Sequence, residues 1–152
     1  MSLKSIVSPQ QKPLIRCLPT DFIDEAIAMM IEGERNAIAV IEAGNKLVGI
    51  LTDHDVIRAV HDAQSKSGNV SNLFVKDWMS PKVITCPLGT KLTESLRIMG
   101  KHKIRHLVVK EDGRAVAIVS IRDVLSQIHH NDELEVNVLR DIALASRGII
   151  AA

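Results

Sequence analysis

The stretch Gly49-Ile50-Leu51-Thr52-Asp53-His54-Asp55 decides the fold, because it occurs again, in altered form, as Ala117-Ile118-Val119-Ser120-Ile121-Arg122-Asp123. In both copies an apolar, β-rich segment ends at a hydroxyl residue, and an aspartate follows three positions later. A Thr or Ser with an acidic residue three positions on is the capping-box pattern that begins a helix. Each stretch therefore predicts a strand that leads directly into a helix.

The likeness of the two stretches extends over most of the chain as an internal repeat. The copies are shifted by 69 residues before a glycine turn and by 68 residues after it. Matching pairs are Ile15 and Ile84, Cys17 and Cys86, Glu25 and Glu94, Met30 and Met99, Val40 and Val109, and then Ile50 and Ile118, Asp55 and Asp123, and Val56 and Val124. The first copy therefore has one extra residue in its turn, within Gly44-Asn45-Lys46.

Each copy predicts the same order of elements, β-α-β-β-α. The expected segments are a short strand at 14–17 and 83–86, a helix at 22–31 and 92–99, a hairpin at 37–51 and 107–119, and a last helix at 53–60 and 121–128. Such a unit is too small to bury both faces of its sheet alone. We therefore expect an α/β protein in which the two copies pack sheet to sheet around one shared core.

Polar sequence separates the copies, and a further helix is expected after the second one. The boundaries follow as repeat 1 at 8–62, a linker at 63–72, repeat 2 at 73–130 and a C-terminal helix at 131–148. Asn131 and Asp132 are suited to cap that helix, and Gly148 is suited to end it. We assign no part of the fold to Met1-Ser2-Leu3.

The composition excludes several classes of function. Aromatic residues make up only 2% of the chain and the formal net charge is +1, which argues against nucleic acid as the main partner. No apolar run approaches the roughly 20 residues that span a bilayer, and the N-terminus lacks the pattern of a signal peptide. Two cysteines are too few for a disulfide framework. We therefore expect a reduced, cytoplasmic protein with no nucleic-acid or membrane partner.

The repeated motif admits two interpretations. Its residues can serve only as helix caps, since capping alone explains the spacing. They can also bind a ligand, because a helix N-terminus suits a phosphate and a carboxylate accepts hydrogen bonds from the two hydroxyls of a ribose. Gly49 would then allow a ligand to approach the strand closely.

The motif resembles the nucleotide motif of CBS domains, Gly-x-x-(Thr or Ser)-x-x-Asp at a junction of strand and helix, present twice. The stretches 78–85 and 103–109 also resemble parts of that family, and the resemblance covers roughly residues 8–128. It implies a stand-alone Bateman module, two CBS repeats with pseudo-twofold symmetry and a ligand cleft on either side. It also implies a homodimer that binds AMP, ADP, ATP, NAD(H) or S-adenosylmethionine, performs no catalysis, and signals to an unidentified regulated protein.

The resemblance assigns ligand-binding roles to particular residues. Phosphate and ribose contacts fall on Thr52 and Asp55, on Ser120 and Asp123, and further phosphate contacts on His54, Arg122, Asn36, Ala37, Arg105 and His106, while Ile15 and Val83 help to enclose the adenine. Since Arg105, His106 and Arg122 all lie in the second repeat, we expect the phosphates to prefer the second motif. The chain departs from the family pattern at Ala117, which replaces a glycine and is expected to narrow one cleft, and it lacks the common proline after Leu107.

Other kinds of site are less favoured by the sequence. His129 and His130 are followed by acidic residues, but adjacent helical residues face different ways and the spacing matches no known metal site. Cys17 and Cys86 hold equivalent positions and are expected to be small buried residues rather than redox partners. The cluster 53–55 contains an acid and a base, yet no nucleophile accompanies it. We therefore expect no catalytic residue and no metal. The alternative to ligand sensing is a ligand-free interaction and assembly module.

Overall fold

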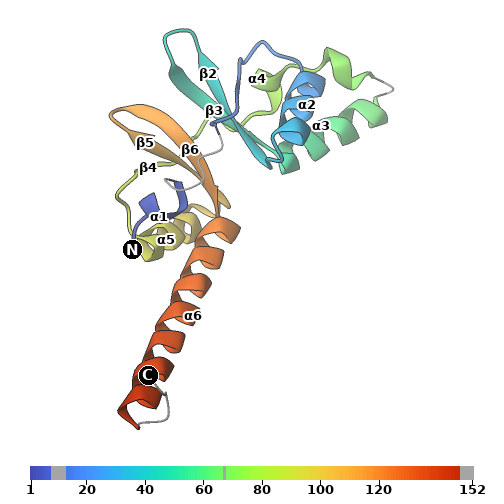
Figure 1. Cartoon of the computed structure of the whole chain (residues 1–152). Helices are drawn as coiled ribbons and strands as arrows, with labels where there is room; N and C mark the ends of the chain where they lie inside the picture. Colours follow the sequence, from blue (N-terminus) through green and yellow to red (C-terminus); the bar gives the residue numbers. More distant parts are fainter. Residues whose placement is uncertain (8–12, 67, 148–152) are drawn as a thin grey trace.

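The computed structural model describes residues 1–7, 13–66 and 68–147. In chain order the elements are α1 (Lys4–Val7), β1 (Arg16–Cys17), α2 (Ile23–Glu32), β2 (Ala37–Glu42), β3 (Lys46–Thr52), α3 (Asp53–Ser65), the 3-10 turn η1 (Val70–Asn72), α4 (Val75–Trp78), β4 (Thr85–Pro87), α5 (Leu92–His102), β5 (His106–Glu111), β6 (Arg114–Ser120) and α6 (Ile121–Ser146). The expected order β-α-β-β-α occurs twice, so the α/β repeat is confirmed (Figure 1).

Each repeat has its own three-stranded sheet, in the order β1-β2-β3 and β4-β5-β6. The first strand of each sheet pairs in parallel with the second, and the second and third form an antiparallel hairpin. The register shifts at the equivalent residues Val40 and Val109, which indicates a β-bulge in both hairpins. The first turn spans 43–45 and the second only 112–113, so the extra residue lies where the sequence predicts it. Gly44 and Gly113 have φ of 81° and 75°, a conformation that glycine adopts without strain.

The two repeats have separate hydrophobic cores, so the expectation of one shared core is wrong. Ile38, Val40 and Leu51 belong to the core of repeat 1, and Leu107 and Val109 belong to the core of repeat 2. Each of these cores lies between one face of a sheet and the helices that cover it.

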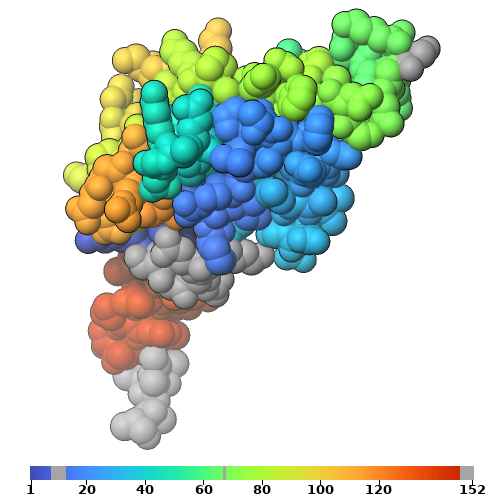
Figure 2. Space-filling model, turned by 90° about the horizontal axis from the view of Figure 1, so that it is seen from above, coloured from blue at the N-terminus to red at the C-terminus, as the bar shows by residue number. Residues whose placement is uncertain are grey.

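The other faces of the sheets meet between the repeats through small side chains. Ala39 of β2 and Val108 of β5 are fully buried and belong to neither core. Strands β2 and β6 are in contact, and Figure 2 shows the two hairpins side by side. Alanine and valine let the sheets approach closely, but they add too little apolar volume to make this interface a third core.

The short helix before each repeat packs against the other repeat. Leu3 is fully buried in the core of repeat 2, and its N–H donates to Thr90 O at 2.9 Å. Val75 of α4 is fully buried in the core of repeat 1, where Phe74 stacks on Phe22 at a centroid distance of 5.0 Å. Leaving Met1-Ser2-Leu3 without a part in the fold was therefore wrong. The expected boundary at residue 73 does not separate the two cores, because Val75 lies after it and belongs to the core of repeat 1. Residues 8–12, which open the expected repeat 1, lie outside the described residues.

The expected linker begins inside a helix. Helix α3 continues to Ser65, because no glycine or proline interrupts it before Gly68, and Ala63 is 4% exposed on its inner face. Turn η1 follows and packs beside α2. The polar residues of 61–65 therefore form the outer face of a helix.

The last helix of repeat 2 and the expected C-terminal helix are one continuous helix, α6, of 26 residues. Asn131 does not cap a new helix, since its side chain accepts a hydrogen bond from Gln127 at 3.1 Å. No glycine or proline stands between the two expected helices, so the first has no reason to end. The expected end at Gly148 lies outside the described residues.

Candidate functional site

Both copies of the repeated motif form capping boxes. The N–H and the Oγ1 of Thr52 donate to Asp55 Oδ2 at 2.9 and 3.1 Å. The Ser120 N–H donates to Asp123 Oδ2 at 2.8 Å, and the Asp123 N–H donates to Ser120 Oγ at 3.1 Å. The capping interpretation is thus confirmed for α3 and α6. It leaves the second carboxylate oxygen of each aspartate available for further contacts, although Arg58 lies 3.6 Å from that of Asp55.

Backbone hydrogen bonds hold each motif beside the start of the second strand of its own repeat. The Asp53 N–H donates to Asn36 O at 2.9 Å, and the Ile121 N–H donates to Arg105 O at 2.8 Å. The two junctions therefore have equivalent backbone contacts. Side chains at these strand starts also face the motif of the other repeat, because the two repeats meet here.

The first of two clefts between the repeats, here called the Ser120 cleft, has a volume of about 440 Å³. Repeat 2 contributes Ser120, Arg122 and Asp123. The opposite wall comes from repeat 1 and comprises Pro13, Leu14, Glu34, Arg35, Asn36 and Ala37. A ligand in this cleft would contact both repeats.

The second cleft, here called the Thr52 cleft, has a volume of about 390 Å³ and is built in the same way with the repeats exchanged. Repeat 1 contributes Thr52, Asp53, His54 and Asp55. The opposite wall comes from repeat 2 and includes Ser80, Lys82, Val83, Lys103, Arg105 and His106. The two clefts are thus related by the pseudo-twofold symmetry that the resemblance implies.

The crossing of the two repeats overturns the expected grouping of charges. Arg105 belongs to the second repeat in sequence, yet it lines the Thr52 cleft and not the Ser120 cleft. Lys82 and Lys103, which the sequence analysis did not select, stand on the same wall. Of the three side chains expected near the second motif, Arg105 faces only the first motif, His106 lines both clefts, and Arg122 lines the Ser120 cleft as expected. Arg35 of repeat 1 joins Arg122 in the Ser120 cleft. The order of residues along the chain does not show this, because the wall opposite each motif comes from the other repeat, about 50 or more residues away in the sequence.

His106 is special because it lines both clefts. Burial lowers the pKa of its imidazole below the ordinary value, while the carboxylates of Asp53 and Asp123 raise it and Arg105 lowers it. Its equivalent in the first repeat is Ala37, which cannot titrate. One ionisable side chain therefore lies between the clefts and interacts with an aspartate at the start of α3 and another at the start of α6.

The helix N-termini in the two clefts differ in their electrostatics. At the start of α3, the Asp53 carboxylate accepts the His54 N–H at 2.8 Å. The equivalent position at the start of α6 is Ile121, which has no acceptor to place there. A phosphate at α3 would compete with the Asp53 carboxylate, whereas a phosphate at α6 would not.

Ile15, Gly49 and Ala117 were also singled out from the sequence, and only Ala117 lines a cleft. Ile15 packs against the core of repeat 1, and Leu14, the equivalent of Val83, lines the Ser120 cleft in its place. A Cβ at Gly49 would lie 2.5 Å from Met79 Sδ and 3.0 Å from the backbone oxygen of Ser80. The missing side chain therefore makes room for another part of the protein rather than for a ligand. Ala117 does line the Ser120 cleft, yet this is the larger of the two.

The remaining candidates offer no reactive centre. Cys17 and Cys86 are 4% and 3% exposed, as expected for small buried residues. Burial raises the pKa of Cys17 to about 12 and raises that of Cys86, so neither is a ready nucleophile. His129 makes an ion pair with Glu133 at 3.3 Å when protonated. Within residues 1–7, 13–66 and 68–147, the structure places no three His, Cys, Asp or Glu side chains close enough to hold a metal ion, and no helix there is long and apolar enough to cross a membrane.

Two sheets with crossed clefts and a repeated hydroxyl-aspartate motif define a tandem pair of CBS domains. The sequence model of the CBS domain matches residues 4–62 and 75–130, and the chain belongs to the CBS domain family. The first match begins at Lys4, which agrees with the buried N-terminal segment.

The relatives and solved structures agree with this assignment. The chain is 30% identical over 125 residues to the mitochondrial CBS domain-containing protein CBSX3 of Arabidopsis thaliana, covering 78% of this chain and 59% of that one. A CBS-domain protein of Agrobacterium tumefaciens superposes with a TM-score of 0.74 at 25% identity, over 84% of this chain and 98% of that one. The CBS domain pair of protein MJ0100, solved in complex with 5'-methylthioadenosine and S-adenosyl-L-methionine, gives a TM-score of 0.72 at 26% identity, over 86% of this chain and 98% of that one.

Proposed function

We propose that the protein is a regulatory, energy-sensing module that binds an adenosine nucleotide in its two clefts and signals the bound state to a partner protein. The observation that carries the proposal is the construction of the clefts. Each combines a hydroxyl-aspartate motif from one repeat with the strand start of the other, and together they offer both carboxylates and cations. This is the set of groups that a ribose and a phosphate require.

The contacts can be assigned to groups that line the clefts. In the Ser120 cleft, Asp123 would hold the ribose hydroxyls and Ser120 would donate to a phosphate oxygen, with Arg122 and Arg35 as countercharges. In the Thr52 cleft, Asp55 and Thr52 take the same roles. Leu14 and Val83 would contact the adenine from equivalent positions.

The distribution of charge suggests that phosphates bind differently in the two clefts. The Thr52 cleft has Lys82, Lys103 and Arg105 on its far wall, but the Asp53 carboxylate occupies the start of α3. Its phosphates would therefore lie toward the far wall. In the Ser120 cleft the position equivalent to Asp53 is Ile121, so the Asp123 carboxylate of the capping box has no second carboxylate beside it, and a phosphate would bind nearer to the helix.

AMP, ADP, ATP, NAD(H) and S-adenosylmethionine all contain adenosine, and the proposal rests on this shared part of the ligand. The MJ0100 pair, which is similar in fold and 26% identical, is in complex with two adenosine compounds, and this supports an adenosine ligand here. No step of bond making is part of the proposal, because the cleft residues supply binding groups and the buried thiols are poor nucleophiles.

Signalling would require contact with another protein, and we propose a cytoplasmic homodimer as the functional unit. Ile57 and Leu125 are equivalent residues on α3 and α6, 65% and 50% exposed, and they would form part of that interface. A ligand that binds both repeats would shift their relative position, and the interface would transmit the shift.

A thermal-shift screen tests the proposal. A ligand that binds only the folded state raises the melting temperature by mass action, so at least one of AMP, ADP, ATP, NAD, NADH and S-adenosylmethionine should do so. GTP serves as the control for a nucleotide with another base. If no adenosine compound shifts the transition at millimolar concentration, the proposal is wrong.

The second candidate is a ligand-free assembly module, favoured by the finding that both motifs form complete capping boxes. In that case Asp55→Asn and Asp123→Asn would lower stability by about 1 kcal/mol each through the caps, with no adenosine compound bound to the native chain. A nucleotide retained through purification and identified by mass spectrometry would exclude this candidate.

A further inference from the structure

The equivalence of the two repeats is broken at His106. This residue begins β5 and pairs with Ser120 across the hairpin, while the equivalent residue of repeat 1, Ala37, begins β2 and pairs with Thr52. His106 lines both clefts, whereas of the two clefts Ala37 lines only the Ser120 cleft. Since the alanine side chain cannot ionise, a single imidazole serves both clefts.

The charged groups around His106 come from several elements. Asp53 at the start of α3 and Asp123 at the start of α6 interact with its imidazole, and so does Arg105, the residue before it. The other ionisable side chains of the Ser120 cleft are Glu34, Arg35 and Arg122. Those of the Thr52 cleft are His54, Asp55, Lys82 and Lys103. The imidazole therefore responds to the charges at both helix starts.

A bound phosphate would change the charge of this side chain. Burial lowers the pKa of His106 and outweighs the two aspartates, so the imidazole of the free chain is mostly uncharged near pH 7.5. A phosphate monoester carries about 1.5–2 negative charges at pH 7. Bound beside Ser120 or Thr52, it raises the pKa of His106, because an opposite charge nearby favours the protonated form.

We propose that an anionic adenosine nucleotide in either cleft binds together with a proton on His106, and that this shared proton favours an anionic nucleotide in the other cleft. The proton comes from the solvent, and no bond of the nucleotide changes. The inference rests on the proposed function and names the class of ligand that is linked in this way. Phosphate-bearing nucleotides belong to it, whereas S-adenosylmethionine, with a sulfonium in place of a phosphate, does not.

The number of protons and the direction of the pH effect follow from the geometry. Only one of the two equivalent positions has an imidazole, so filling both clefts adds no more than a single proton. The first ligand bears the free-energy cost of protonation, and the second meets a charge that is already present. Once the pH falls below the pKa of the free chain, His106 is protonated before any ligand binds, and the coupling disappears.

Calorimetric titration with AMP at pH 7.5, repeated in two buffers that differ in ionisation enthalpy, measures the protons taken up. The native chain should take up more than His106→Asn, in which only AMP itself is left to be protonated. The native isotherm should also be steeper than that of two independent sites, with occupation of one cleft strengthening the other about fivefold. His106→Asn should lose this steepness, and adenosine, which has no phosphate, should not cause the uptake.

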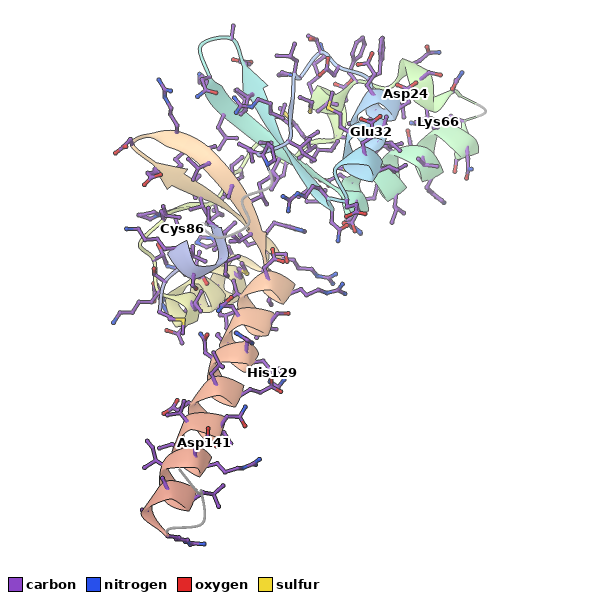
Figure 3. The ribbon with its side chains drawn as sticks, viewed as in Figure 1. Asp24, Glu32, Lys66, Cys86, His129 and Asp141 are labelled. Atoms are coloured by element: carbon purple, nitrogen blue, oxygen red, sulfur yellow. The ribbon has the colours of Figure 1, made fainter. Side chains whose placement is uncertain are left out.

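Two kinds of variant serve as controls. His129→Asn makes the same residue change on the part of α6 that extends away from the two sheets, where His129 is exposed, and it should behave as the native chain does (Figure 3). Asp55→Ala leaves the Ser120 cleft, and Asp123→Ala leaves the Thr52 cleft. Each should still show proton uptake that His106→Asn removes, and uptake in only one of them would refute the link between the clefts.

A second measurement needs neither adenosine binding nor a substitution of His106. The pKa of the His106 imidazole is followed by NMR in sodium sulfate and in sodium chloride at equal ionic strength, since sulfate is an anion that does not titrate in this range. Sulfate should raise the pKa, and Asp53→Asn and Asp123→Asn should each lower it in the free chain. An unchanged pKa in sulfate would overturn the inference.

The outcomes separate this inference from the proposed function. If AMP binds with equal proton uptake in the native chain and His106→Asn, the inference is wrong and the proposed function stands. If sulfate raises the pKa of His106 but no adenosine compound binds, the linkage between anion and proton stands and the proposed function is wrong.

Discussion

Replacing Arg105 by alanine should weaken nucleotide binding in the Thr52 cleft and spare the Ser120 cleft. Arg105 lines the Thr52 cleft and not the Ser120 cleft, although it belongs to the second repeat in the sequence. A hydrogen bond to a charged group contributes about 1.5–3 kcal/mol. Arg105 is exposed, and solvent screens its charge, so we expect the lower end of this range. That corresponds to roughly a tenfold loss of affinity.

The assay is calorimetric titration with ATP in chains where only one cleft binds. On the Asp123→Ala background only the Thr52 cleft remains, and Arg105→Ala should lower its affinity. On the Asp55→Ala background the same change should have little effect. Arg35→Ala is the matched control, because Arg35 lines the Ser120 cleft and its effects should be reversed. If Arg105→Ala acts on the Asp55→Ala background instead, the crossed construction of the clefts is refuted.

Three further predictions concern stability, measured by urea unfolding. Burial lowers the pKa of His106 below 6.5, so just below that pH the unfolded chain binds more protons than the folded chain, and the free energy of unfolding should fall as the pH is lowered. In His106→Asn the free energy of unfolding should fall less over the same pH range, and an equal fall would show that His106 is not the cause. Gly49→Ala should cost about 1–3 kcal/mol through its close contacts, whereas Gly100→Ala, with nothing within 4 Å, should be neutral or stabilising. Leu3→Ala should cost about 2–5 kcal/mol, and Met1→Ala, at 69% exposure, should change little; a harmless Leu3→Ala would contradict the packing of the N-terminus on repeat 2.

Local signals in the sequence were sufficient for the repeated unit. The shift between the copies located both hairpins and the extra residue of the first turn, where Gly44 adopts a positive φ. The spacing of Thr52 and Asp55 predicted a helix cap, and the structure has that cap. Such features depend on neighbouring residues only, so they can be recognised without knowing how the repeats meet.

Features that depend on contacts between distant segments could not be predicted in this way. The burial of Leu3 depends on repeat 2, about 90 residues further along the chain, and three N-terminal residues carry no pattern of their own. The place of Arg105 depends on how one sheet packs against the other. Equivalence between the copies did contain one usable signal, since it relates Val83 to Leu14, which lines the Ser120 cleft.

The extent of α6 illustrates a different failure. Asn131 and Asp132 are favoured at helix starts, but they are also tolerated on the exposed side of a helix that is already formed. Without a glycine or proline nearby, the pattern could not distinguish a new helix from the continuation of an old one. As a result, a single helix begins at the Ser120 cleft and continues to Ser146.

The most direct test of ligand binding is a calorimetric titration of the native chain with AMP, beside Asp55→Ala, Asp123→Ala and the double variant. Each aspartate lies in one cleft, so the native chain should bind at two sites, each single variant at one, and the folded double variant at none. Absence of binding to the native chain at millimolar AMP and at millimolar levels of the other adenosine compounds, or undiminished binding to the double variant, would contradict an adenosine-sensing role for these clefts.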